Sequence, residues 1–233
     1  MHLKQIFQGI YSDDRRIYTE NMVKGKKVYG EKLISFKGTE FREWNPYRSK
    51  LGAGIKKSVK SPLKKNMNVL YLGAAEGTTI SHISDIVGNK GLIIGIDISA
   101  RVMRKLVELS EERENIIPYL EDANKLDETK KELEGIKFDF MFQDISQKNQ
   151  TEIFLNNAKT FLEKGKPAMI SIKARSISQK NAKQILQEEK QKLEKEFYIK
   201  YSVFLEPFQK QHLLVSCEKK WKRNKANLFE KVK

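Results

Sequence analysis

Two charged residues stand at the ends of apolar segments, where they could move a proton. Asp144 is the last residue of the segment 138–144, and Lys173 is the last residue of the segment 167–173. Such segments are typical of buried parallel strands, and in open α/β sheets the reacting atoms lie outside the carboxyl ends of the strands. Neighbouring strands lie about 4.8 Å apart, so the two side chains can meet if their strands pair. The alternative is an ordinary surface salt bridge.

A loop of small residues follows the apolar segment 68–72. It contains Gly73, Ala75 and Gly77 and runs into Thr78 and Thr79. Small residues let the backbone turn tightly and approach a ligand before a helix begins, so we expect Gly73, Ala75 and Gly77 to contact a cofactor. Any tight turn from strand to helix also favours glycine, so the loop alone is weak evidence.

Carboxylates at two further strand ends strengthen the prediction of a nucleoside site. Asp97 ends the segment 92–97 and can accept hydrogen bonds from both ribose hydroxyls, although it could instead cap a helix, a role open to Ser99 as well. After the segment 116–120 come Glu121, Asp122 and Ala123, where a carboxylate can accept from an adenine amino group. Because the ends of three successive predicted strands carry such residues, the sequence favours a site for ribose and adenine.

The same loop separates two classes of nucleotide cofactor. It lacks the three-glycine spacing that directs a helix N-terminus at a pyrophosphate, and Glu76 would repel one. An acidic residue there suits the cationic amino-acid end of S-adenosyl-L-methionine. A methyltransferase is therefore favoured over a dehydrogenase.

Methyl transfer from a sulfonium to a ribose 2'-hydroxyl needs an in-line approach and a group that removes the hydroxyl proton. A lysine crowded by other cations can lose its own proton near neutral pH and act as that base, while a neighbouring carboxylate orients it. Lys50 is the candidate for the second cation. The proton acceptor is left open between Lys173 and Asp144.

The chain divides into two predicted domains, residues 1–45 and 46–233. The first contains short β-branched and aromatic segments that predict a small antiparallel sheet. From Pro46, which we expect near the first turn of a helix, apolar segments alternate with helical ones and end in two consecutive strands. The expected fold is therefore α/β, with a mostly parallel sheet covered on both faces.

Composition points to a polyanionic partner. The chain has 45 Lys and Arg against 30 Asp and Glu, a formal charge of +15. Residues 56–65 hold five lysines and no acid, and the tail from Glu218 holds seven basic residues against two acids; both are candidate phosphate tracks, or simply solvated surface. With one cysteine, three scattered histidines and no long apolar segment, we expect no metal site and a cytoplasmic protein.

Several longer motifs resemble one family of RNA-modifying enzymes. In chain order they are WNPYRSKLGAGI, YLGAAEGTTISHISDIVG, EDA, QDISQ, SIKARS and LEPFQKQH. Together, from about Ser35 to Val215, they resemble the fibrillarin family of RNA 2'-O-methyltransferases. The resemblance implies a class I S-adenosylmethionine-dependent methyltransferase domain, with a Rossmann-like seven-stranded sheet, preceded by a small N-terminal β-domain. A Gly/Arg-rich N-terminal tail is absent, as expected for the archaeal form.

The resemblance also implies site residues. Lys50, Asp144 and Lys173 would be the catalytic set, with a fourth member at either Glu206 or His212. Asp97 stands where many members have Glu. The residues expected to line the cofactor site are Thr78, Thr79, Asp97, Ile98, Asp122, Ala123, Asp144, Ile145, Ser146 and Gln147.

Fibrillarin-like proteins act in a ribonucleoprotein, so the resemblance implies several partners: a box C/D guide RNA, a target rRNA or tRNA, a Nop-family scaffold protein and a kink-turn-binding ribosomal-type protein. Two rival hypotheses remain. One is a methyltransferase of small molecules or proteins with incidental positive charge, and the other is a non-catalytic RNA-binding module that keeps the fold.

Overall fold

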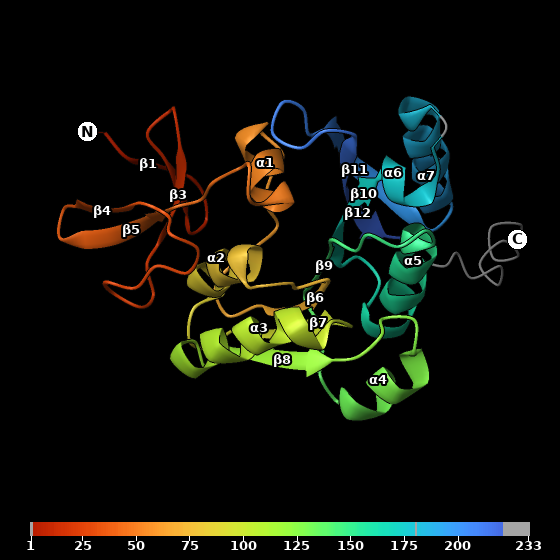
Figure 1. Cartoon of the computed structure of the whole chain (residues 1–233), viewed down its shortest axis with the longest axis horizontal. Helices are drawn as coiled ribbons and strands as arrows, with labels where there is room; N and C mark the ends of the chain where they lie inside the picture. Colours follow the sequence, from red (N-terminus) through yellow and green to blue (C-terminus); the bar gives the residue numbers. More distant parts are fainter. Residues whose placement is uncertain (1, 180, 221–233) are drawn as a thin grey trace, which may run out of the picture.

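Two separate sheets form the framework of the molecule (Figure 1). The computed structural model describes residues 2–179 and 181–220. The first sheet is antiparallel with strand order β1-β2-β3-β5-β4. Its strands are β1 (Lys4–Phe7), β2 (Ile10–Ser12), β3 (Ile17–Glu20), β4 (Leu33–Phe36) and β5 (Thr39–Glu43). A sheet is thus present where the sequence predicted one; the domain boundary at residue 45 stays a prediction.

The second sheet has seven strands in the order β11-β12-β10-β9-β6-β7-β8. Its strands are β6 (Asn68–Leu72), β7 (Leu92–Asp97), β8 (Ile116–Leu120), β9 (Phe140–Gln143), β10 (Pro167–Lys173), β11 (Phe197–Phe204) and β12 (His212–Lys219). The five strands from β6 to β10 run parallel, and β12 is antiparallel to both of its neighbours. The carboxyl ends of the parallel strands and the start of β12 therefore share one edge, as expected for the α/β fold.

Helices cover both faces of this sheet because alternate strand residues point to opposite sides. Val69 and Tyr71 of β6 belong to one apolar core, and Leu70 and Leu72 belong to the other. The first core contains side chains of α1 (Lys50–Lys56), α2 (Thr78–Val87) and α3 (Ala100–Glu112). The second contains side chains of α5 (Gln150–Phe161) and α7 (Ala182–Glu196). Two short helices, α4 (Leu126–Glu132) and α6 (Ala174–Ile177), were not predicted.

The helix expected to open at Pro46 begins later. Residues 46–48 form a turn in which the Asn45 side chain accepts from the Tyr47 amide at 2.9 Å. The helix α1 starts at Lys50, and the Ser49 hydroxyl accepts from the Gly52 amide at 3.0 Å as its N-cap. The prediction was wrong because a side-chain cap, which a serine supplies and a proline does not, determines where this helix begins.

A network of buried charges joins the N-terminal sheet to α2. Arg42 of β5 pairs with Asp85 at 2.9 Å and with Glu31 at 2.6 Å, and Arg113 pairs with the same Asp85 at 2.7 Å. These four side chains are at most 1% exposed. His82, equally buried, stacks on the Trp44 ring with a centroid distance of 4.8 Å. We call these six residues the buried network; none of its ion pairs was predicted.

No helix within the described residues has the length and apolar character needed to cross a membrane.

Candidate active site

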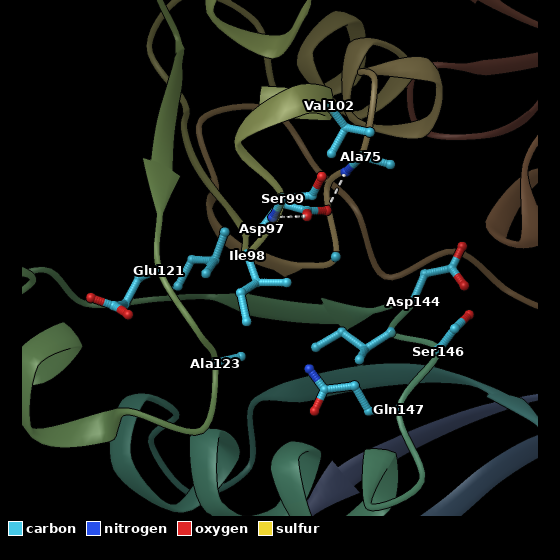
Figure 2. A pocket seen from close by; sticks show the side chains of 13 residues that line it. Ala75, Asp97, Ile98, Ser99, Val102, Glu121, Ala123, Asp144, Ser146 and Gln147 are labelled. Carbon is cyan, nitrogen blue, oxygen red and sulfur yellow. Dashed lines mark hydrogen bonds between the residues drawn. The ribbon is translucent and has the colours of Figure 1, made fainter. Parts of the chain in front are cut away.

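A pocket of about 370 Å³ opens at the carboxyl edge of the seven-stranded sheet (Figure 2). Its walls come from the loop after β6, the end of β7 and the start of α3, the segment after β8, and the turn after β9. The lining residues are Gly73, Ala75, Ile96, Asp97, Ile98, Ser99, Val102, Glu121, Ala123, Asp144, Ile145, Ser146 and Gln147. Nine of the thirteen predicted cofactor residues are among them.

The loop after β6 and the turn after β9 touch each other at Gly73. Its φ is +81°, and a Cβ built on it would lie 2.5 Å from the Asp144 carbonyl oxygen. The Asp144 amide in turn donates to the Leu72 carbonyl at 2.9 Å. Only glycine satisfies both the backbone angle and the close approach, so Gly73 brings the loop and Asp144 to the same side of the pocket.

Asp97 lines the pocket and binds two backbone amides of its wall. Its carboxylate accepts from the Ala75 amide at 3.0 Å and from the Ser99 amide at 2.9 Å (Figure 2). Each carboxylate oxygen keeps acceptor capacity beyond these bonds, because an ionised carboxylate has about four lone-pair sites. Beside it, Ile98 is 59% exposed and points into the pocket, which gives the site an apolar wall.

Four predicted cofactor residues lie outside the pocket lining: Gly77, Thr78, Thr79 and Asp122. Gly77 has a φ of +99° and immediately precedes α2. The Asp122 carboxylate accepts from the amide and the side chain of Asn124, at 2.9 and 2.8 Å. The pocket is lined instead by Glu121, its neighbour in the same predicted motif.

Sequence reasoning also missed Ile96, Ser99 and Val102, which line the pocket. Ile96 lies in β7 directly before Asp97, whereas Ser99 and Val102 follow Ile98 at the start of α3. Their closeness in sequence to Asp97 and Ile98 was the available signal. Glu76, predicted to face the cofactor, is outside the lining and pairs with Lys105 of α3 at 2.9 Å. That ammonium lowers the pKa of the Glu76 carboxyl.

Thr79 lies in a buried chain of hydroxyl groups below the pocket. Its Oγ1 donates to the Ser49 hydroxyl at 2.9 Å, next to the start of α1. The Tyr71 hydroxyl is hydrogen-bonded to Thr79, and burial, followed by the charge of Asp144, raises the pKa of Tyr71 well above its usual value. This chain connects β6 and α2 to Ser49, the N-cap of the helix that carries Lys50.

The predicted catalytic residues come together at this edge. Lys50 Nζ lies 2.9 Å from Asp144 Oδ2, and the two side chains are 28% and 13% exposed. As expected, β9 and β10 are neighbours, but the ion pair of Asp144 is with Lys50. Among the described residues the Lys173 ammonium has no ion-pair or hydrogen-bond partner. The Lys173 backbone is held by the Gln150 side chain, which accepts from its amide at 2.9 Å and donates to its carbonyl at 3.1 Å.

His212 joins these three residues. It is the direct cross-strand partner of Lys173 in the β10–β12 pair, which places the two side chains on the same face. Burial lowers the pKa of His212, and the charges of Lys50 and Lys173 lower it further. The neutral ring donates from Nδ1 to the Lys210 carbonyl at 2.8 Å, so Nε2 keeps a lone pair. We call Lys50, Asp144, Lys173 and His212 the catalytic cluster.

Glu206, the alternative fourth member, faces a different groove, and its carboxylate accepts from the Gln211 amide at 2.7 Å. The two residues were indistinguishable in sequence because their position depends on how the loop between β11 and β12 folds. Within the described residues no group of three or more His, Cys, Asp or Glu could hold a metal ion.

The lysine-rich segment 56–65 does not form one continuous track. Lys56 Nζ donates to the Asp14 carbonyl at 3.0 Å, and Lys57 Nζ donates to the Glu206 carbonyl at 2.7 Å. Lys60 and Lys64 line a separate groove beside Lys166. The basic tail, from residue 221 onward, lies outside the described residues.

Comparisons with known proteins agree on one family. Residues 1–221 match the family model for fibrillarin. A fibrillarin-like rRNA/tRNA 2'-O-methyltransferase from Thermococcus sibiricus is 45% identical over 223 residues, which cover 93% of this chain and 98% of the relative. The fibrillarin pre-rRNA processing protein of Methanococcus jannaschii has a TM-score of 0.89 and 45% identity, covering 95% of this chain and 98% of that one.

Two other solved structures show fibrillarins with bound molecules. Aeropyrum pernix fibrillarin, in complex with natively bound S-adenosyl-L-methionine, has a TM-score of 0.84 and 37% identity over 93% of this chain and 98% of that one. A fibrillarin in complex with Nop5p has a TM-score of 0.83 and 39% identity, over 93% of this chain and all of the other. The family match over nearly the whole length and these identities show that the chain belongs to the fibrillarin family.

Proposed function

We propose that this protein transfers a methyl group from S-adenosyl-L-methionine to a ribose 2'-hydroxyl of rRNA or tRNA. One observation carries the proposal: Asp144 lines the nucleoside-sized pocket and also pairs with Lys50 of the catalytic cluster. The site for a methyl donor and the site for a proton acceptor therefore meet at one residue. The relative's name, rRNA/tRNA 2'-O-methyltransferase, supports the same activity.

The pocket residues fit S-adenosyl-L-methionine. A volume of about 370 Å³ lies within the range of roughly 300 to 1,000 Å³ that cofactor-sized ligands occupy. Asp97 has acceptor capacity for the ribose hydroxyls, and Ile98, Val102 and Ile145 offer apolar surface to an adenine ring. The natively bound cofactor in Aeropyrum pernix fibrillarin supports this assignment.

The bound cofactor would supply an electrophilic methyl group on a sulfonium. For the hydroxyl proton, we assign Lys173 Nζ, in its neutral amine form, as the acceptor, because Asp144 is already paired with Lys50 whereas Lys173 Nζ has no partner among the described residues. Lys50 orients the Asp144 carboxylate and brings a second cation to the cluster, and the His212 ring lies beside Lys173. Gln150 fixes the Lys173 backbone, so the lysine side chain starts from a defined position at the edge of the sheet.

The proposed partners follow from the family and from charge. The complex of a related fibrillarin with Nop5p supports a Nop-family scaffold for this chain. We further propose that a box C/D guide RNA selects the target nucleotide and that a kink-turn-binding ribosomal-type protein completes the complex. A net charge of +15 supports binding to an RNA polyanion.

Calorimetric titration with S-adenosyl-L-methionine, followed by label transfer to guide-paired RNA with scaffold proteins added, tests the proposal. The target nucleotide carries either a 2'-hydroxyl or a 2'-deoxy position. We expect binding, and transfer to the hydroxyl form only. Transfer to the deoxy form would point to base methylation, and absence of cofactor binding would favour a non-catalytic RNA module.

A further inference from the structure

A second groove lies beside the catalytic cluster. It has a volume of about 600 Å³, and its lining includes Lys183, Phe204, Glu206 and Gln211. Gln211 immediately precedes His212, and its carbonyl accepts from the Ala174 amide, next to Lys173, at 3.2 Å. Figure 1 shows α6, α7 and β11, which carry or flank these residues, together at one end of the seven-stranded sheet. We call this the flanking groove.

The register of the sheet sets the distance between the flanking groove and the cluster. Phe204 pairs with Leu213 across β11 and β12, and Leu213 pairs with Ile172 across β12 and β10. Phe204 is therefore two strands away from the residue before Lys173, or about 10 Å at about 4.8 Å per strand. Because successive strand residues point to opposite faces, the Phe204 side chain lies on the face of Ile172 and Leu213, and an RNA strand would pass from Lys173 to Phe204 across the carboxyl edge of the sheet. About three nucleotides of stacked strand cover that distance at about 3.4 Å each.

The flanking groove is positively charged at its rim. Arg175 Nε donates to the Gln211 side chain at 2.7 Å, which leaves the terminal guanidinium nitrogens free of partners among the described residues. The Lys183 ammonium likewise has no partner in the described parts of the chain. The one carboxylate in the groove, Glu206, is held by the Gln211 amide at 2.7 Å.

An exposed aromatic ring, Phe204, lines the flanking groove together with Lys183, and Arg175 is bonded to Gln211 of the same lining. Phe204 ends β11 and is 44% exposed, although a phenylalanine at a strand end gains stability from burial. Proteins often bind RNA strands with basic side chains next to an exposed aromatic ring. The cations bind phosphates, and the ring packs on a base or ribose.

We propose that the flanking groove binds the RNA strand next to the target nucleotide. Phe204 packs on a nucleotide about three positions from the target, while Arg175 and Lys183 bind the phosphates of that strand. This contact keeps the target ribose at Lys173 and contributes affinity for RNA without touching the reacting atoms. The inference rests on the proposed function, because it requires an RNA target at the catalytic cluster.

The first test compares two exposed aromatic residues of the same strand. Phe204→Ala should raise the KM for target RNA about five-fold or more in the reconstituted complex, with kcat and the Kd for S-adenosyl-L-methionine unchanged. Tyr198→Ala is the matched control, because Tyr198 is 51% exposed on β11 but at its opposite end. Its kinetics should equal those of the original protein. An unchanged KM for Phe204→Ala, or an equal rise for both variants, would overturn the proposal.

The second test measures how the KM for target RNA depends on salt concentration. Lys183→Gln should reduce the slope of log KM against log salt concentration by about 0.7 to 0.9, as expected for one lost phosphate contact.

Binding of the scaffold protein is measured in parallel. If Phe204→Ala weakens scaffold binding and not RNA binding, the groove docks a protein and the proposal is wrong. If the unmutated protein fails to methylate RNA, the proposed function itself fails, whereas an active protein with an unaffected Phe204→Ala variant rejects this inference alone.

Discussion

The catalytic cluster and the buried network are built from similar charged side chains but differ in how completely these are partnered. In the buried network, Asp85 accepts from two guanidinium groups, from the Thr19 hydroxyl at 2.7 Å and from the Met22 amide at 3.2 Å, and it is fully buried. In the catalytic cluster, Asp144 has a single ion pair and remains 13% exposed, and the ammonium of Lys173 has no partner among the described residues.

The difference separates charges that hold the fold together from charges that we propose take part in methyl transfer. A buried charge needs several partners to offset its desolvation, and those partners leave it no capacity to exchange a proton or bind a substrate. A charge at an open strand end keeps that capacity. Charge type alone therefore does not distinguish these two regions; the number of partners does.

Removing the amine of the catalytic cluster should have the largest effect. Lys173→Ala should lower the rate of methyl transfer by about 10² to 10⁴, the usual contribution of a general base, while the Kd for S-adenosyl-L-methionine stays within about two-fold. Single-turnover label transfer and calorimetry measure the two quantities. Loss of cofactor binding in this variant would contradict the role assigned to Lys173.

Breaking the buried network should affect stability instead. Asp85→Asn leaves Arg42 and Arg113 short of a negative charge in the interior, and we expect the free energy of unfolding to fall by about 3 to 5 kcal/mol. Urea denaturation measures this loss, with Asp144→Asn as the control, expected to change by less than about 1 kcal/mol. If both variants lost equal stability, the contrast between the two regions would not hold.

Asp97 combines features of both regions, because its carboxylate holds two backbone amides and also lines the pocket. Asp97→Ala should weaken S-adenosyl-L-methionine binding by about 1 to 3 kcal/mol, or about 5-fold to 150-fold in Kd. Asp97→Glu, the residue that many members of the family carry, should restore most of the affinity. An unchanged Kd in Asp97→Ala, measured by calorimetry, would remove the ribose assignment.

Substitution of Thr79 tests whether the chain of hydroxyl groups affects cofactor binding or the position of Lys50. Thr79→Val keeps the side-chain shape but removes the bond to Ser49, so we expect kcat to fall by about 2-fold to 10-fold with the cofactor Kd unchanged. Thr79→Ser should return kcat to the original value. A weaker cofactor Kd with normal kcat would instead support the cofactor contact that the family resemblance implies.

His82 provides the smallest and most specific test of the buried network. Burial lowers the pKa of His82 well below its usual value of 6.5, so below about pH 6.5 the unfolded chain binds a proton that the folded protein excludes. The stability that this contributes is complete above about pH 6.5 and falls below it by at most about 1.4 kcal/mol per pH unit. Denaturation between pH 7 and 5 should show a weaker pH dependence in His82→Gln; an identical slope in the variant would show that another group titrates.

Most strands could be predicted because their signal is local. The segments 68–72, 92–97 and 167–173 match β6, β7 and β10 residue for residue, since continuous apolar residues bounded by loops specify a buried strand wherever the chain takes them. The short helices α4 and α6 were missed because neither is long enough to display a helical period. The start of α1 was misplaced because Ser49, and not Pro46, determines where the helix begins.

Within the site, motif order identified the strand ends but not the direction of each side chain. Asp122 and Glu121 are neighbours in one motif, yet only Glu121 lines the pocket, because adjacent residues after a strand point in different directions. Thr79, which the family resemblance places at the cofactor, bonds through its hydroxyl to Ser49, the N-cap of α1. No local pattern distinguishes such neighbours.

The sequence by itself determined the alternation of strands and helices, the positions of the strand ends and the chemical types of residue placed there, because each depends on residues close together in the chain. Only the tertiary structure decided which of those residues meet: Lys50 with Asp144, His212 rather than Glu206 beside Lys173, and Arg42 and Arg113 around Asp85. These contacts join segments far apart in sequence. They exist because strand order and register bring the segments together, and that order minimises the exposed apolar surface of the whole chain and not of any one segment.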